Sequence, residues 1–127
     1  MSDTELAWAA GVFESEGTVS AARPRNRLRI RAAVTQNGGE EAKAFLERFV
    51  RAVGQGKVLG PYDYSNRYAS SSLGKKPRYV VQYQTEEKVR ELLCALRPYL
   101  TPNSPKWCRY LELLAETQRE KGGERIS

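Results

Sequence analysis

The sequence predicts an α+β fold in which helices pack on one face of an antiparallel sheet, in the order α-β-β-α-β-β-α with a last helix appended. Three observations support this prediction. Residues Leu28–Gln36 alternate strictly between apolar and polar or small side chains, which is the pattern of a half-buried strand. Residues 40–53 and 86–96 instead carry apolar side chains at helical spacing. Gly17 and Gly54 each end a helical pattern where a strand pattern follows.

The N-terminal elements are a helix and a hairpin. Ser2, Asp3 or Thr4 can cap the helix, which runs to Glu16 and ends at Gly17. The hairpin is predicted from a strand, a basic turn and a second strand, at Thr18–Arg23, Pro24–Arg27 and Leu28–Gln36. The second strand has an apolar face of Leu28, Ile30, Ala32 and Val34 and an outer face of Arg29, Arg31, Ala33 and Thr35. The hairpin is therefore expected to bury one face and to present arginines on the other.

The remaining elements follow the same order of helix, strand, strand and helix. They are predicted as a helix at Glu40–Val53, a strand at Gly56–Pro61, a polar loop at Tyr62–Pro77, a strand at Arg78–Gln84 and a helix at Glu86–Leu96 capped by Thr85. A linker at Thr101–Pro105 leads into a last helix that begins at Ser104 or Pro105 and ends at Gln118, with a frayed tail over 119–127. The chain of 127 residues fits one domain, spanning 1–127.

Composition and charge exclude several classes of site. Lys and Arg number 21 against 15 Asp and Glu, and the resulting net charge of +6 suits a polyanionic partner. Because histidine is absent, the chain cannot carry Ser-His-Asp or Cys-His catalysis, a histidine zinc site or a histidine nuclease base. Cys94 and Cys108 fall in apolar helical patterns and are predicted to be reduced core thiols. No leader and no bilayer-length apolar run is found, so we expect an intracellular protein of the cytoplasm, nucleoid or organelle matrix, neither secreted nor membrane-bound.

The stretch Ala9–Gly17, with the sequence AAGVFESEG, is the most informative part of the chain. Small residues that permit close helix packing run into two acids and a helix-ending glycine, and acids at such a point can hold a divalent metal. This stretch resembles the LAGLIDADG motif. Three further stretches are similar to that family at the expected positions: VTQ at Val34–Gln36, GQGKV at Gly54–Val58 and LRPYL at Leu96–Leu100. The resemblance covers nearly the whole chain and implies the LAGLIDADG homing endonuclease fold, with a saddle-shaped sheet.

The resemblance also implies a homodimer, since the chain carries a single motif. The expected dimer contacts follow i, i+3, i+4, i+7 spacing on the first helix and are Ala7, Ala10, Gly11 and Glu14. Such a dimer would bring two Glu16 carboxylates near its axis, where Mg²⁺ would relieve their repulsion. The backbone carbonyl of Ser15 is the expected additional ligand. Mn²⁺ is a possible substitute, and Ca²⁺ is expected to bind without supporting cleavage.

Two further residues match catalytic positions of the family. Gln36 matches the position that orients the attacking water, and Lys106 is the best candidate for the basic residue that stabilises charge at the scissile phosphate. Each also has a plainer interpretation, because Gln36 can simply end a strand and Lys106 can be a solvated lysine at a helix start. The linker Thr101–Pro105 stands where family members often carry lysines, so the register of Lys106 departs from the pattern. Glu14 is interpreted as structural, satisfying backbone groups near the helix end.

The uncovered face of the predicted sheet would lie in the major groove of double-stranded DNA. Carrying over the family's strands implies these groove-facing residues: Ser20, Ala22, Asn26, Arg27, Arg29, Arg31, Ala33, Lys57, Leu59, Arg78 and Val80. The best base readers among them are the arginines Arg27, Arg29, Arg31 and Arg78, because a bidentate contact from arginine to guanine is the commonest specific one. The basic residues of the turns are expected to contact phosphates instead, and they are Arg23, Arg25, Lys75 and Lys76.

Together these features predict a site-specific homing endonuclease associated with intron or intein mobility. A homodimer would bind a long pseudo-palindromic DNA target and hydrolyse one phosphodiester per strand with divalent metal, without a small-molecule substrate. The alternative is a catalytically degenerate LAGLIDADG protein kept as a DNA-binding regulator or RNA maturase. A third interpretation, a small α+β interaction domain with no nucleic-acid role, predicts no salt-dependent affinity for DNA.

Overall fold

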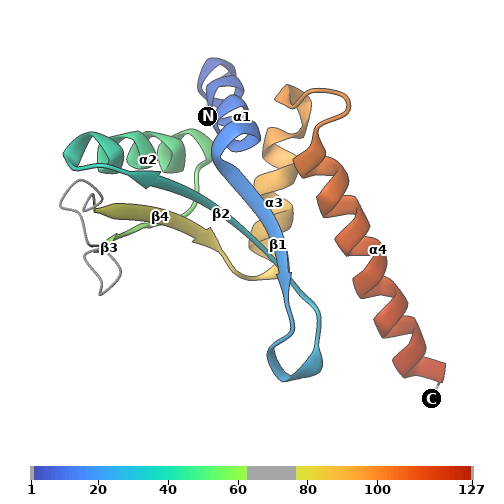
Figure 1. Cartoon of the computed structure of the whole chain (residues 1–127). Coiled ribbons are helices and arrows are strands. Elements are labelled where there is room, and N and C mark those ends of the chain that lie inside the picture. The colour runs from blue at the N-terminus through green and yellow to red at the C-terminus, as the bar shows by residue number, and fades with distance from the viewer. Residues whose placement is uncertain (1, 63–76, 127) are drawn as a thin grey trace.

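The computed structural model of the chain describes residues 2–62 and 77–126. It confirms the α+β fold and the predicted order of the elements (Figure 1). The elements are α1 (Asp3–Glu16), β1 (Gly17–Ala22), β2 (Arg29–Asn37), α2 (Glu40–Val53), β3 (Val58–Tyr62), β4 (Arg78–Tyr83), α3 (Glu86–Leu96) and α4 (Pro105–Ile126). Two short 3₁₀ turns, η1 (Pro24–Asn26) and η3 (Arg97–Tyr99), complete the described chain, and η1 lies within the predicted basic turn Pro24–Arg27.

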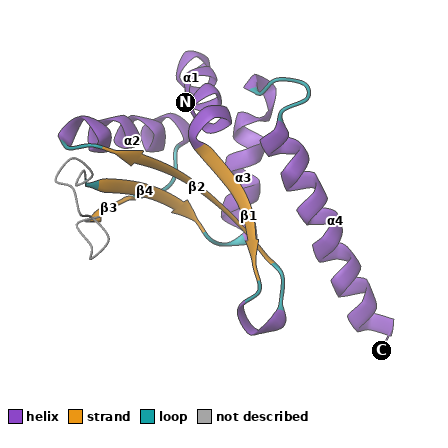
Figure 2. Ribbon diagram, viewed as in Figure 1, coloured by secondary structure: helices purple, strands orange, loops and turns teal. Residues whose placement is uncertain are grey.

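The strands form one four-stranded antiparallel sheet in the order β1-β2-β4-β3. In its interior, Val34 of β2 lies opposite Gly17 of β1 on one side and Val81 of β4 on the other. Helices α1, α2 and α3 pack on one face, and α4 runs beside β1 at the sheet edge (Figure 2). Among the described residues no helix covers the opposite face, which we call the uncovered face. The one-sided arrangement predicted from the sequence is therefore confirmed.

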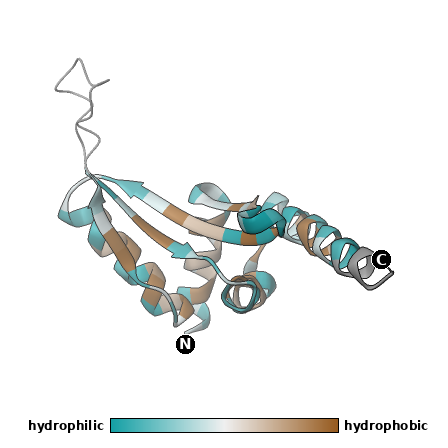
Figure 3. Ribbon diagram, turned by 90° about the horizontal axis from the view of Figure 1, so that it is seen from below, coloured by the Kyte–Doolittle hydropathy of each residue, from teal (hydrophilic) through white to brown (hydrophobic). Residues whose placement is uncertain are grey.

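The helix-covered face of the sheet is apolar. It buries alternate residues of the two central strands, namely Ile30, Ala32, Val34, Val81 and Tyr83. The helices add the large buried side chains Phe13, Leu46, Phe49, Leu92 and Leu93. Figure 3 shows the resulting bands of hydrophobic and hydrophilic residues along the strands. Because burying one such side chain contributes about 1.5–3 kcal/mol, this core fixes which side chains of β2 and β4 must point outward.

Both ends of α1 have an identifiable cause. At the N-terminal end Ser2 caps the helix, where its Oγ accepts a hydrogen bond from the Glu5 N–H at 3.2 Å. The helix ends at Glu16, as predicted, but Gly17 has φ −81° and does not use the left-handed region. A Cβ at Gly17 would instead lie 2.5 Å from the Phe13 ring and 2.6 Å from the Phe13 carbonyl oxygen. Glycine at this position therefore lets β1 leave directly from the last helical turn.

The third strand begins two residues later than the sequence predicts. Gly54 has φ 79° and ends α2, and Gly56 has φ 114°, so the chain cannot enter the sheet before Val58. A Cβ at Gly56 would lie 2.7 Å from the Tyr83 hydroxyl, which donates a hydrogen bond to the Gln55 carbonyl at 3.0 Å. Burial raises the pKa of this hydroxyl, which keeps it protonated as a donor. This hydrogen bond from Tyr83 thus holds the turn between α2 and β3 in place.

The last helix is longer than predicted. We expected it to end at Gln118 with a frayed tail over 119–127, but α4 continues to Ile126. An ion pair between Arg23 and Glu120, 2.8 Å long, ties this extension to the β1–β2 hairpin. That partner comes from a distant part of the chain, so the local sequence does not reveal it. Most of the predicted loop Tyr62–Pro77 lies outside the described residues.

The cysteine prediction was wrong in one respect. Cys94 and Cys108 are free thiols, as expected, but both are exposed rather than part of the core. The buried positions closest to them in α3 and α4 are instead Leu93 and Tyr110. None of the helices in the described part of the chain has the length and apolarity needed to cross a membrane.

Candidate functional site

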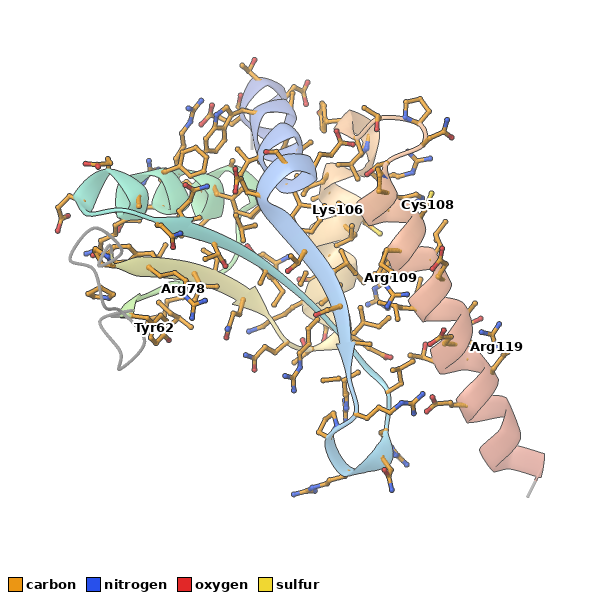
Figure 4. The ribbon with its side chains drawn as sticks, viewed as in Figure 1. Tyr62, Arg78, Lys106, Cys108, Arg109 and Arg119 are labelled. Carbon is orange, nitrogen blue, oxygen red and sulfur yellow. The ribbon has the colours of Figure 1, made fainter. Side chains whose placement is uncertain are left out.

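Strand register places most of the predicted groove-facing residues together on the uncovered face. Ser20 lies opposite Arg31, and Ala22 lies opposite Arg29. The predicted residues that share this face are Ser20, Ala22, Arg29, Arg31, Ala33, Leu59, Arg78 and Val80. Val80 is only 6% exposed and pairs with Leu59, so these two form an apolar floor rather than a reading surface. Figure 4 shows Arg78 beside Tyr62, with the guanidinium 5.9 Å from the ring centroid.

Arg31 faces a pocket in the uncovered face. The pocket has a volume of about 140 Å³, and Ser20, Ala33, Gln82 and Gln84 line it beside Arg31. The Nε of Arg31 is buried and has no hydrogen-bond partner among residues 2–62 and 77–126. A buried donor without a partner costs about 1–3 kcal/mol, so this geometry favours a ligand that brings an acceptor. Guanine edges and phosphate oxygens both offer such acceptors.

The tip of the β1–β2 hairpin is basic and strained. Arg25 and Asn26 have φ 56° and 64°, in the left-handed region that asparagine tolerates but that costs a residue such as arginine roughly 1–2 kcal/mol. Arg25, Arg27 and Arg29 line a hollow of about 360 Å³ at this tip. Arg23, predicted to contact phosphate, pairs with Glu120 in this structure. Strain and clustered positive charge at one exposed tip are consistent with binding of an anionic partner.

Lys57 is exposed and immediately precedes β3, so it extends the positive charge to the far edge of the sheet. Lys75 and Lys76, predicted to contact phosphates, lie outside the described residues.

Two acids occupy the last turn of α1, with no basic residue beside them in the turn. Glu14 is half-buried, and Glu16 is exposed where the helix meets β1. Carboxylates at a helix C-terminus oppose the helix dipole, at a cost of roughly 0.3–1 kcal/mol each at an exposed site. Such a local conflict is typical of functional positions. The carboxylate of Glu16 and the adjacent carbonyl of Ser15 are hard oxygen donors of the kind Mg²⁺ prefers.

Gln36 lies close to this helix end through the pairing of β1 and β2. Gly17 pairs with Val34, so β2 runs past the end of α1 and reaches Gln36 two residues later. Gln36 is half-buried on the helix-covered side, opposite Tyr79 of β4. The register thus gathers Glu16 and Gln36 at one corner of the sheet. Within the described ranges, no three His, Cys, Asp or Glu side chains cluster as a metal-binding group.

Glu14 holds the linker that precedes α4. Its Oε1 accepts hydrogen bonds from the backbone N–H and the Oγ1 of Thr101, both at 2.9 Å. The Thr101 backbone N–H, together with the Thr101 and Ser104 hydroxyls, holds the pKa of Glu14 below its usual value. Glu14 thus satisfies a backbone N–H, but one in the distant linker and not one near its own helix end, where its partners were expected.

Lys106 lies in the first turn of α4 (Figure 4). Ser104 caps this turn, since its Oγ accepts a hydrogen bond from the Trp107 N–H at 3.4 Å. Lys106 is half-buried, so it differs from a fully solvated lysine. The helix that carries it packs beside β1, on the side of the sheet where Glu16 ends α1.

The predicted dimer contacts on α1 divide into two groups. Ala10 is fully buried inside the subunit, so it packs against the core of its own chain. Ala7 and Gly11 are exposed, and a Cβ at Gly11 would meet no atom within 4 Å. Thr4 and Ser15 continue this exposed stripe at helical spacing. The outward face of α1 is thus lined by small residues along its length.

Two polar residues in and just after β4 were not predicted as part of this surface. Gln82 and Gln84 share the uncovered face with Arg31, and a hydrogen bond of 2.7 Å joins their side-chain amides. The same alternation that identified Arg78 and Val80 extends to both positions, so the strand pattern contained this signal. Amide side chains at such positions can contact adenine or phosphate.

Comparisons with known proteins match the fold rather than the sequence. No family model and no curated protein matches the chain. The crystal structure of the LAGLIDADG meganuclease I-CpaMI bound to uncleaved DNA matches with a TM-score of 0.65 and 15% identity, over 99% of this chain and 41% of that one. I-CvuI in complex with a DNA target matches with a TM-score of 0.62 and 15% identity, over 91% and 68%. The archaeal intron-encoded I-Vdi141I complexed with DNA matches with a TM-score of 0.60 and 18% identity, over 98% and 74%.

These matches establish that the chain has the fold of LAGLIDADG homing endonucleases. The chain spans less than half the length of I-CpaMI and about three quarters of I-Vdi141I. I-CvuI was crystallised with uncleaved DNA in 2 mM Mg and with its own target in 2 mM Ca.

Proposed function

We propose that the chain is one subunit of a homodimeric, metal-dependent, site-specific endonuclease of double-stranded DNA. The observation that carries this proposal is the position of Glu16 beside an uncovered sheet face that presents arginines. The fold supports it, because solved proteins of the same fold are homing endonucleases in complex with DNA. Intron or intein mobility is the genetic role that this activity would serve.

The uncovered face would occupy the major groove, which admits a two-stranded ribbon. Arg29 and Arg31 would contact base edges, with Gln82 and Gln84 beside them. Arg25 and Lys57 lie at opposite ends of this surface and would contact phosphates. The unpartnered Nε of Arg31 would gain an acceptor in the complex, which makes Arg31 the best candidate for a specificity-determining residue.

The chemistry would take place where the C-terminal ends of two α1 helices meet. Glu16 and the Ser15 carbonyl would hold Mg²⁺ or Mn²⁺, and the metal when bound supplies an activated water and charge stabilisation at the leaving oxygen. Gln36 would orient the attacking water, and Lys106 would stabilise negative charge at the scissile phosphate. Each subunit would hydrolyse one strand.

Dimerisation would use the exposed small-residue stripe of α1. Ala7 and Gly11 permit close approach of a symmetry-related helix, as a two-fold interface requires. Gly11→Leu fills this stripe without meeting any atom of its own subunit at the Cβ position, so the subunit should fold and remain monomeric. Analytical ultracentrifugation of wild type and Gly11→Leu tests this, and a dimer that survives the substitution would place the interface elsewhere.

The activity is tested by cleavage-site selection. The protein is incubated with a randomised double-stranded DNA library in Mg²⁺, and molecules with new ends are recovered and sequenced. We expect a long, partly palindromic consensus in Mg²⁺ and none in Ca²⁺. Arg31→Ala should lower affinity for the selected duplex by about 1–3 kcal/mol and relax the consensus at one position per half-site. Recovery of random ends, or the same consensus from Glu16→Gln, would contradict the proposal.

A DNA-binding regulator or RNA maturase without cleavage activity is the second candidate. The five-residue linker Thr101–Pro105 favours it, since it displaces Lys106 from the position at which lysines follow the family's third helix. This candidate predicts tight, salt-dependent binding of nucleic acid with no nicking in Mg²⁺ or Mn²⁺.

A further inference from the structure

One carboxylate joins the two elements that carry the proposed catalytic groups. Glu14 lies two residues before Glu16 on α1, and its partners Thr101 and Ser104 lie just before Lys106. Thr101 is bound through both its backbone N–H and its hydroxyl, so the linker is held at two points by a single carboxylate oxygen. Separation of α1 from the first turn of α4 therefore requires both bonds to break.

Hydrogen bonds within the linker Thr101–Pro105 connect Thr101 to the first turn of α4. The Ser104 N–H donates to the Thr101 carbonyl at 3.1 Å, and Ser104 is fully buried. The Cys108 N–H donates to the Ser104 carbonyl at 3.0 Å, which begins the hydrogen-bonded ladder of α4. Lys106 lies within this first turn. A shift of Thr101 relative to α1 would consequently move the Lys106 backbone.

A second contact, independent of Glu14, holds the first turn of α4. The Arg97 guanidinium lies 4.9 Å from the centroid of the Trp107 ring, next to Lys106. Arg97 belongs to η3, which follows α3 and packs against α1. This contact does not involve Glu14, so loss of the Glu14 bonds alone should displace Lys106 without unfolding α4.

We propose that Glu14 is a positioning residue that sets the location of Lys106 relative to Glu16, rather than only a structural acceptor at the end of α1. This inference rests on the proposed endonuclease function. Glu14 does not itself contact substrate or metal. Its effect on the reaction is exerted through Lys106.

The kinetic test compares Glu14→Ala, Lys106→Ala and the double variant on the duplex recovered by site selection. Glu14→Ala should lower the single-turnover cleavage rate by about 10–100-fold, as expected for a misplaced catalytic group, with dissociation of DNA little changed. In the Lys106→Ala background the same change should have almost no further effect. Glu14→Gln keeps one oxygen acceptor for Thr101 and should recover most of the rate.

Glu5→Ala is the matched control, because it makes the same chemical change on the same helix at the end that contacts α2. Its cleavage rate should equal that of wild type. If Glu14→Ala cleaves like wild type, or if the losses of the two single variants multiply in the double variant, the positioning role is overturned. If Lys106→Ala cleaves at the wild-type rate, the role is likewise overturned while the endonuclease function stands.

Amide hydrogen exchange provides a test that does not depend on cleavage. Glu14→Ala should accelerate exchange at Thr101 and through the first turn of α4, and Glu5→Ala should not. Unchanged protection over 100–108 in Glu14→Ala would overturn the inference even for a protein that cuts no DNA. Accelerated exchange in a protein that fails to cleave DNA would support the link from Glu14 through Thr101 to α4, and it would contradict only the proposed function.

Discussion

The two ends of α1 carry glutamates that are held in different ways. At the N-terminal end, Arg48 donates two hydrogen bonds to the Glu5 carboxylate, at 3.0 and 2.7 Å, and stacks 3.9 Å over the Trp8 ring. At the C-terminal end, Glu14 is held by the neutral donors of Thr101. Both arrangements lower the pKa of the glutamate, Glu5 chiefly through the Arg48 hydrogen bond and Glu14 chiefly through the Thr101 N–H.

The difference concerns net charge. The Glu5–Arg48 pair is neutral as a whole and links α1 to α2, which is an arrangement suited to stability. Glu14 keeps its full negative charge, and Glu16 adds a second one that makes no ion pair among the described residues. One end of the helix therefore anchors the fold, while the other end concentrates negative potential where a cation would be favourable.

Removal of the Glu16 charge should have the largest effect. Glu16→Gln should lower the cleavage rate about 10³-fold or more, because the proposed metal loses its carboxylate ligand. The same change should leave the melting temperature equal or slightly higher, since a charge that opposes the helix dipole is removed. Single-turnover cleavage and thermal melting measure the two effects. A loss of activity accompanied by a lower melting temperature would mean that Glu16 stabilises the fold instead.

Addition of one methyl group at the junction should have the next largest effect. Gly17→Ala places a Cβ 2.5 Å from the Phe13 ring, so we expect a loss of about 1–3 kcal/mol in the free energy of unfolding. Gly11→Ala, on the same helix, meets no atom within 4 Å in its own subunit and should not destabilise it. Urea unfolding at several protein concentrations separates subunit stability from dimerisation. Equal stability of Gly17→Ala and wild type would refute the packing explanation.

Acidification should affect both ends of the helix. The folded-state pKa of each glutamate lies below its ordinary value of 4.5, so each carboxylate contributes stability above about pH 4.5 that is lost as the pH falls through the folded pKa. The double variant Glu5→Gln, Glu14→Gln should therefore lose less melting temperature than wild type between about pH 5 and about pH 3. Parallel melting curves of the two proteins over this range would contradict the assignment.

Ionic strength should change the stability contributions of Glu5 and Glu14 differently, and this is the smallest of the expected effects. The Glu5–Arg48 pair is partly exposed, and its attraction is screened as ionic strength rises. The bonds of Glu14 come from neutral donors and should respond less. The stability difference between wild type and Glu5→Gln should thus shrink from about 0.05 M to about 1 M NaCl, while that for Glu14→Gln should persist. Thermal melts at the two salt concentrations give the comparison.

Most of the fold follows from local patterns. The alternation in Leu28–Gln36 and the helical spacing in 40–53 gave the correct element types and nearly correct ends. The errors occurred where distant residues decide the outcome. The start of β3 depends on the Tyr83 hydroxyl beneath Gly56, and the length of α4 involves an ion pair to Arg23. Both cysteines were assigned to the core because helical spacing alone does not fix which face of a helix is buried.

The candidate site could be predicted only in part from the sequence. Alternate residues of a strand face the same side of the sheet, so Arg29 and Arg31 could be assigned to the uncovered face from the sequence. The same alternation along β4 would have assigned Gln82 to this face. The partners of Glu14 could not be predicted, since 87 positions separate it from Thr101 along the chain. The burial of Ala10 likewise depends on how α1 packs, and its small size fits both a core and an interface.

The parity of β2 has a practical consequence for protein engineering. Odd-numbered positions such as Arg29, Arg31 and Ala33 face the uncovered side, whereas Ile30, Ala32 and Val34 build the core. Combinatorial libraries that vary only the odd positions of β2 and the even positions at the end of β4, such as Gln82, would leave the buried set intact. Variants with altered DNA-sequence preference can therefore be sought without stabilising mutations elsewhere. A variant that fails to bind would indicate lost recognition of DNA and not a folding defect.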